Sequence, residues 1–114
     1  MKTERQIIFY KHYFTEFYLL QTKRVQEKIE FVFKILRTVD RVPKKFLEHL
    51  SDTDGLYEIR VEVGSEIFRV FCCFDKGNLV ILFNGFQKKT PKTSKQELES
   101  ALKHKRDYFA SKNK

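Results

Sequence analysis

Two arginines on neighbouring predicted strands have a residue type and spacing suited to acting on a phosphate. Residues 56–63 (LYEIRVEV) and 66–74 (EIFRVFCCF) place their side chains alternately on two faces, as strands do. Gly64-Ser65 suits a two-residue hairpin turn between them, because a type II′ turn takes glycine first. In that register Arg60 lies directly opposite Arg69. Because arginine stays charged and holds phosphate oxygens in a planar fork, the pair suits an anionic ligand.

The arginine pair also has a purely structural explanation. Like charges directly opposed across two strands destabilise a sheet unless anions lie nearby. Glu58 and Glu62 share the face of the first strand that carries Arg60. Their carboxylates would neutralise the arginines without any ligand, so the sequence leaves both explanations open.

A third predicted strand extends this face into a possible groove. Residues 78–84 (NLVILFN) follow a turn signal at Lys76-Gly77, and a turn of two residues there would pair Arg69 with Asn84. Two guanidinium groups and an amide would then form a row, with Phe86 at its edge. Such a face resembles an RNA groove, with forks for phosphates and a ring for base stacking, although a phenylalanine like Phe86 is more often a core residue than a stacking platform.

Most of the excess positive charge lies after this strand. The 114 residues carry a formal net charge of +8; residues 1–85 hold 14 basic and 12 acidic side chains, and residues 86–114 hold 9 and 3. Lys88, Lys89, Lys92 and Lys95 fall within eight residues that contain no acid. Such a cluster is typical of a polyanion-binding site or of a solvated tail. We predict RNA contacts at Asn84, Phe86, Lys92 and Lys95.

The remaining sequence predicts the elements that position this face. Residues 5–10 suit a strand, and residues 13–20 and 25–39 suit helices, the second capped by Thr22. Pro43 either ends regular structure or begins a short helical turn over residues 44–50. Ser94 and Glu97 have the spacing of a capping box before a last helix. The pattern predicts an α+β fold, β-α-α-β-β-β-α, in one domain over residues 1–114, with an antiparallel meander and both early helices on one sheet face.

Several functional classes are excluded by composition and spacing. The three histidines lack metal-ligand spacing, so we expect no metal and no cofactor. Cys72 and Cys73 are adjacent, point to opposite faces of a strand and cannot easily bond each other. No apolar run approaches a membrane span, and the first residues lack a signal-peptide core. We therefore expect a cytoplasmic protein without a membrane partner.

Residues 55–90 and 95–108, with LYEIR, FRVF and GFQKKT as their most specific segments, resemble the RelE/HigB superfamily of bacterial toxins, in particular its phage-derived HigB-like branch. The resemblance covers essentially the whole chain. It implies a RelE-like fold and a small cytoplasmic toxin that cuts mRNA on the ribosome. A cognate antitoxin, a HigA-like helix-turn-helix protein, would hold it inactive.

The resemblance also implies roles for particular residues. Arg69 falls at the position of an arginine that assists cleavage, Arg60 at a basic position of the preceding strand, and Lys88 and Lys89 at a basic pair after the last strand. We therefore predict these four as catalytic residues. The chain departs from some relatives in lacking a tyrosine or histidine over residues 86–92. A catalytic acid assigned to such a residue does not carry over.

Metal-independent RNA cleavage needs a base for the ribose 2′-OH, cations for the phosphorane and an acid for the leaving 5′-oxygen. The arginines suit the second task. For proton transfer the sequence offers Lys88 or Lys89, with a pKa lowered by neighbouring cations, and His49. The identity of base and acid stays open at this stage.

Two other functions fit the same pattern. A ParE-like toxin would share the fold and inhibit DNA gyrase without RNA chemistry, since fold alone does not determine function. A catalytically silent module would bind nucleic acid or only its antitoxin. The basic cluster favours the ribonuclease over the gyrase inhibitor, whereas a silent module would bind RNA through the same cluster and leave it intact.

Overall fold

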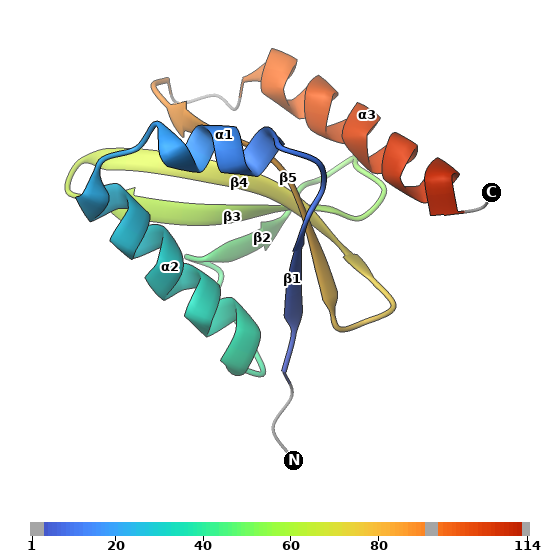
Figure 1. Ribbon diagram of the computed structural model, residues 1–114, viewed down its shortest axis with the longest axis horizontal. Helices are drawn as coiled ribbons and strands as arrows, with labels where there is room; N and C mark the ends of the chain where they lie inside the picture. Colours follow the sequence, from blue (N-terminus) through green and yellow to red (C-terminus); the bar gives the residue numbers. More distant parts are fainter. Residues whose placement is uncertain (1–3, 91–93, 113–114) are drawn as a thin grey trace.

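The computed structural model describes residues 4–90 and 94–112. Within them the chain forms five strands and three helices (Figure 1). In chain order these are β1 (Gln6–Phe9), α1 (Tyr13–Leu19), α2 (Lys23–Thr38), β2 (Leu47–His49), β3 (Leu56–Val63), β4 (Glu66–Asp75), β5 (Leu79–Lys88) and α3 (Lys95–Lys112).

All five strands belong to one mixed sheet with the order β1-β5-β4-β3-β2. Strands β2 to β5 pair antiparallel, and β1 pairs parallel to β5. The hairpin of β3 and β4 has the register expected from the sequence, with Arg60 opposite Arg69 and a turn at Gly64-Ser65. The prediction of an α+β fold is confirmed, but the sheet is mixed rather than a purely antiparallel meander.

The expected order of elements lacks one strand. Residues 47–49 form β2 against the edge of β3, where the sequence left a short helical turn as one of two possibilities. The backbone N–H of Arg60 donates to the carbonyl of Phe46, which continues this pairing by one residue. The three apolar and polar residues of so short a strand carry no clear periodicity, so tertiary pairing decides their conformation.

Strand β5 differs from the prediction in its register and its length. The turn before it contains three residues, because Asp75 pairs with Leu79 and both Lys76 and Gly77 have positive φ. A β-bulge then places two residues of β5, Phe83 and Asn84, opposite one residue of β4. As a result Arg69 pairs with Phe86 instead of Asn84. Strand β5 also continues to Lys88, four residues beyond the predicted end at Asn84.

The sheet separates two apolar layers. Helices α1 and α2 cover one face, where buried side chains of α2 pack on those of β3, β4 and β5. Helix α3 covers part of the other face through Ala101, which is fully buried with Phe71 and Phe83. In Figure 1, α2 lies at the left of the sheet and α3 at the upper right, and the start of α1 meets α3 where Tyr13 stacks on His104. The prediction that both early helices share one face is confirmed.

Specific polar contacts and one close approach fix the helices. Thr22 caps α2 by accepting a hydrogen bond from the backbone N–H of Val25, as expected. At the other end of α2 the guanidinium of Arg5 donates to the carbonyls of Leu36, Val39 and Asp40 at 2.7–2.9 Å. A positive charge at a helix C-terminus also opposes the helix dipole favourably.

Helix α1 sits directly on β5 at a glycine. A Cβ built on Gly85 would lie 2.6 Å from the ring of Phe17, closer than any real contact. The absence of a side chain at this position therefore lets α1 pack on the strand that carries Phe86 and Lys88.

Neither cysteine forms a disulfide, and both are buried. Burial raises the pKa of the Cys72 thiol, and raises that of Cys73 to about 11. Among the described residues, no helix is both long and apolar enough to cross a membrane.

Candidate functional site

The side chains of interest lie on the sheet face that α3 covers only in part, here called the arginine face. Three rows of paired residues cross it from β2 or β3 towards β5. The first row contains Glu48, Glu58 and Phe71; the second contains Arg60, Arg69 and Phe86; the third contains Glu62, Ile67 and Lys88. Successive rows are two residues apart along the strands, or about 6.6 Å. The arginine row thus lies between a row with two carboxylates and a row that ends in a lysine.

Arg69 is buried and paired with an acid. Its Nη1 forms an ion pair with Oε1 of Glu58, and the two side chains are only 7% and 3% exposed. Burial lowers the pKa of Arg69, and the nearby carboxylate of Glu48 acts against that shift. The structural explanation of the arginine pair therefore holds for Arg69.

This buried pair is only partly satisfied. Oε2 of Glu58 and Nε of Arg69 are buried and have no hydrogen-bond partner among the described residues. A buried polar atom without a partner costs about 1–3 kcal/mol. One acceptor and one donor therefore remain unused beneath the surface of the arginine face.

Arg60 is the arginine that solvent reaches. Its side chain is 33% exposed, and its Nε lies 3.0 Å from Oε1 of Glu62, whose own side chain is 55% exposed. The contact is an ion pair and not a hydrogen bond, since the Nε atom of Arg60 is buried and has no hydrogen-bond partner among the described residues. An exposed pair of this kind contributes little free energy, so an incoming phosphate can compete with Glu62 for Arg60.

Lys88 lies close to both arginines. Its burial first, and then the charges of Arg69 and Arg60, lower the pKa of the Lys88 ammonium. Three cations on one face repel each other, which favours either an anion among them or loss of a proton from the lysine. The sequence-based expectation of a lysine with a lowered pKa is therefore met at Lys88.

A hollow of about 370 Å³ adjoins this cluster between the end of β5 and the start of α3. It is lined by Phe86, Gln87, Lys88, Lys89, Thr90, Ser94 and Glu97. The ring of Phe86 stacks on that of Phe71 at a centroid distance of 5.5 Å and stays partly exposed beside the hollow. The volume falls within the range of small-molecule sites and suits a nucleotide.

Asn84 does not join the arginine row. The bulge turns it towards α3, where its Nδ2 donates to the backbone carbonyl of Glu97 at 3.1 Å and to Oε1 of Glu97 at 2.9 Å. It is 8% exposed. The position of Asn84 was predicted wrongly: it fastens the start of α3 to β5 instead of facing a ligand.

The other predicted residues are separated from this cluster or lie outside the description. Lys95 is exposed at the first position of α3 and does not line the hollow. Lys92 lies outside the described residues. His49 pairs with Tyr57 and contacts its ring at 5.1 Å, so its side chain is on the opposite face of the sheet from the arginines. His49 is therefore not placed to transfer a proton at Arg60.

Glu48 lies on the arginine face but was not predicted from the sequence. Glu48 pairs with Glu58 across β2 and β3, and its side chain is 44% exposed at the rim of the arginine face. It is also close enough to Arg69 to affect the pKa of that residue. Because β2 was not predicted as a strand, nothing in the sequence indicated which face the side chain would occupy.

No group of three potential metal ligands of the types His, Cys, Asp or Glu occurs in residues 4–90 and 94–112. The charged groups on the arginine face are arginines, a lysine and carboxylates. Together these groups can bind a phosphate, accept a proton on one side of it and donate a proton on the other.

Comparison with known families places this site in a known context. The model of the family described as "Phage derived protein Gp49-like (DUF891)" matches residues 17–106. The chain belongs to this family. The match begins in α1, ends in α3 and includes Arg60, Arg69 and Lys88.

The Gp49-like family is associated with RelE-like toxins. This association agrees with the resemblance noted in the sequence at the level of the superfamily. A search of curated proteins found no match to this Gp49-like chain.

Proposed function

We propose that this Gp49-like protein is the toxin of a type II toxin-antitoxin pair, of the HigB-like branch, and that it cleaves mRNA on the ribosome. The observation that carries the proposal is the meeting of Arg60, Arg69 and Lys88 on one open sheet face beside a nucleotide-sized hollow. Glu58 pairs with Arg69 and Glu62 with Arg60, whereas Lys88 has no ion-pair partner within 4.0 Å among the described residues, so a cation on this face remains available for an anionic ligand.

In the proposed mechanism the scissile phosphate lies over the arginine row. Arg60 is accessible and would hold a phosphate oxygen in place of Glu62. Arg69 lies beneath it and adds positive potential while fixing Glu58. Arginines at this position would stabilise the charge that develops on the pentavalent phosphorane.

The two proton transfers would occur on opposite sides of that row. Lys88 would protonate the leaving 5′-oxygen, because its lowered pKa makes its ammonium a better acid than an ordinary lysine. A carboxylate of the first row would accept the proton of the 2′-OH, and Glu48 is the one that solvent reaches. The 2′-oxygen then bonds to phosphorus as the bond to the 5′-oxygen breaks, leaving a 2′,3′-cyclic phosphate.

The hollow would hold a neighbouring nucleotide. Phe86 offers a partly exposed ring for base stacking, and Lys89 offers a charge for the adjoining phosphate. Binding to the ribosome would orient the mRNA, and orientation alone can lower a barrier by about 7–11 kcal/mol. Weak acid and base groups can therefore suffice.

The same proposal specifies partners and compartment. The target is mRNA in the ribosome, so the protein would act in the cytoplasm. A helix-turn-helix antitoxin would bind it and prevent cleavage, and no metal or organic cofactor enters the mechanism.

The proposal is tested by expressing the protein in bacteria and measuring protein synthesis and DNA supercoiling in parallel. We expect wild-type protein to stop protein synthesis within minutes and leave supercoiling unchanged, and Arg60→Ala to restore synthesis by at least tenfold. Lys34→Ala, which removes an exposed charge on α2, is the matched control and should act as wild type. Loss of supercoiling with synthesis intact would instead identify a gyrase inhibitor of the ParE type.

A further inference from the structure

A second surface that combines cations with aromatic rings lies between α2 and the edge of β3. Beyond the end of β2, two adjoining hollows of about 390 and 280 Å³ separate α2 from β3. They share Lys28, Phe31 and Glu62, and together they form one channel, here called the α2–β3 groove. Neither hollow contains a residue of the hollow beside Phe86 and Lys89.

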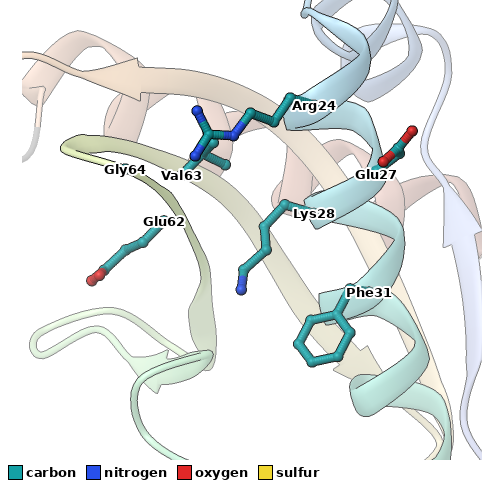
Figure 2. A pocket seen from close by; sticks show the side chains of 7 residues that line it. All are labelled: Arg24, Glu27, Lys28, Phe31, Glu62, Val63 and Gly64. Carbon is teal, nitrogen blue, oxygen red and sulfur yellow. The ribbon is translucent and has the colours of Figure 1, made fainter.

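The groove is predominantly basic. Four cations line it, Arg24, Lys28, Lys45 and Arg60, against two acids, Glu27 and Glu62. In Figure 2 the side chains of Arg24 and Lys28 extend from α2 towards β3, whereas the carboxylates of Glu27 and Glu62 point away from the gap between them. The charge that faces the groove is therefore more positive than the count of lining residues indicates.

Three of these cations are not neutralised by a neighbour. Among the described residues, ion pairs within 4.0 Å involve Arg60 but not Arg24, Lys28 or Lys45. Free cations around a concavity attract a polyanion and bind its phosphates at a salt-dependent cost.

Two aromatic rings, those of Phe31 and Phe46, line the groove. The side chain of Phe31 is 50% exposed, and its ring meets that of Phe46 edge to face at 6.3 Å. The Nζ of Lys28 lies 4.9 Å from the centre of the Phe31 ring, and the Nζ of Lys45 lies 4.9 Å from that of Phe46. Proteins that bind single-stranded nucleic acid combine half-exposed aromatic rings, on which bases stack, with neighbouring cations that bind the phosphates.

The groove is continuous with the candidate active site through Arg60 and Glu62, which line the groove and also belong to the rows of the arginine face. A strand of RNA whose phosphate lies on Arg60 can therefore continue around the edge of β3, where β2 no longer covers it.

We propose that the α2–β3 groove binds single-stranded RNA adjacent to the scissile phosphate, with one base stacked on Phe31 and backbone phosphates on Arg24 and Lys28. This inference rests on the proposed function for the position of the scissile phosphate. The groove itself is assigned from its own charges and rings.

The test uses a fluorescent single-stranded RNA of 12 nucleotides, fully 2′-O-methylated so that it cannot be cleaved, and measures its affinity by anisotropy between 50 and 200 mM salt. For Arg24→Ser with Lys28→Ser we expect at least a tenfold loss of affinity at the lowest salt, and a smaller salt dependence by about 0.7 per lost phosphate contact. The matched control is Lys34→Ser with Arg37→Ser, two exposed cations on the same helix outside the groove.

Phe31→Ala should separate stacking from charge. We expect a loss of about fivefold or more with an unchanged salt dependence, because base stacking does not release counterions. Phe9→Ala is its control, since Phe9 is also 50% exposed but lies on β1. Thermal unfolding of every variant verifies that it is folded.

The outcomes separate this inference from the proposed function. Groove variants that bind the RNA as wild type, or a wild-type protein without measurable RNA binding at 50 mM salt, would overturn the inference. If the same variants instead lose binding of a labelled 12-residue polyglutamate peptide only, the groove is a protein-docking surface. RNA binding that depends on the groove, in a protein that never inhibits translation, would preserve the groove and remove the ribonuclease proposal.

Discussion

Arg60 and Arg69 are opposite each other in the sheet, yet their surroundings give them different tasks. Arg69 is buried with Glu58, whereas Arg60 is partly exposed and only loosely paired with Glu62. The sequence predicts the opposition correctly but cannot predict this difference, because burial depends on β2 and on the path of β5. Stability and activity should therefore respond differently at the two positions.

Removal of the Arg69 guanidinium should destabilise the fold. We expect Arg69→Ala to lower the free energy of unfolding by about 3–5 kcal/mol, because it leaves the carboxylate of Glu58 buried and unpaired. Arg60→Ala should cost about 1 kcal/mol or less, since its pair is exposed. Urea unfolding measures both values.

The double variant Arg69→Met with Glu58→Leu is the control for this prediction. It removes both charges and should recover most of the lost stability. Equal effects of the two single arginine substitutions would contradict the division between a buried and an accessible arginine.

The proton donor should reveal itself in the pH dependence of cleavage. Because the pKa of Lys88 is lowered from its ordinary value of 10.5, cleavage should decline as pH rises through a value below 10.5. Lys88→Arg keeps the charge but cannot lose its proton, so its residual activity should lack this alkaline decline. An identical alkaline decline in the variant would exclude Lys88 as the acid. The measurement is the single-turnover rate of RNA cleavage between pH 6 and 10.

At the scale of elements, α3 is held at three points along its length. Asn84 binds its start through Glu97, and Asp75 accepts hydrogen bonds from Tyr108 and Lys112 near its end. Between them His104 stacks on Tyr13 with ring centroids 3.9 Å apart. The hydrogen bonds that Asp75 accepts from Lys112, first, and from Tyr108 hold the pKa of its carboxyl group below the usual value. The position of α3 matters because its first turn forms one wall of the hollow beside Phe86.

Acidification should loosen α3 through His104. Burial lowers the pKa of His104 below its ordinary value of 6.5, an effect that Lys103 and Lys11 reinforce and Asp107 opposes. The unfolded state then binds more protons than the folded state, so stability rises with pH across this range. We expect the unfolding free energy to fall as pH decreases below 6.5 and through the folded pKa.

The control for this prediction is His104→Gln, which should flatten the pH dependence between pH 7 and 5. A slope that persists in His104→Gln would show that the stacked histidine is not its source. Chemical unfolding at fixed temperature across this pH range gives the comparison.

For the whole molecule, the sequence predicts the β3–β4 hairpin in its correct register, and it brings Phe86 to the edge of the arginine row from a strand predicted to end at Asn84. It does so although two shifts were missed. Asn78 extends the turn by one residue and the bulge at Phe83-Asn84 adds another, so the two shifts together restore the original alternation. Faces alternate with a period of two, so an even total shift preserves them.

The residues that the sequence could not place depend on contacts between distant segments. Glu48 enters the arginine face only because residues 47–49 pair with β3. Asn84 leaves it because Glu97, in another element, accepts its hydrogen bonds. The α2–β3 groove likewise brings together α2, the segment before β2, and β3. Periodicity describes each element separately and cannot supply such pairings.

The fold brings together basic residues that are distant in the sequence. The net charge of +8 is concentrated by sequence in the last quarter, but the fold brings Lys88 from that quarter beside two arginines of the nearly balanced body. Arg24 and Lys28 add a second basic surface that sequence position alone does not reveal. The net charge can thus guide RNA towards the face that would act on it.

The most direct measurement of the central claim is the chemistry of the RNA ends. Purified protein is added to a translation reaction that is reconstituted from purified components and contains a defined mRNA. The positions and the chemical groups of the cleaved RNA ends are then determined. We expect wild-type protein to yield 2′,3′-cyclic phosphate and 5′-hydroxyl ends. Addition of a transition-metal chelator should leave the cleavage rate unchanged. Arg60→Ala and Lys88→Ala should each lower the cleavage rate by at least a hundredfold, and Lys34→Ala should not. Intact mRNA with wild-type protein, or undiminished cleavage in both site variants, would contradict the account.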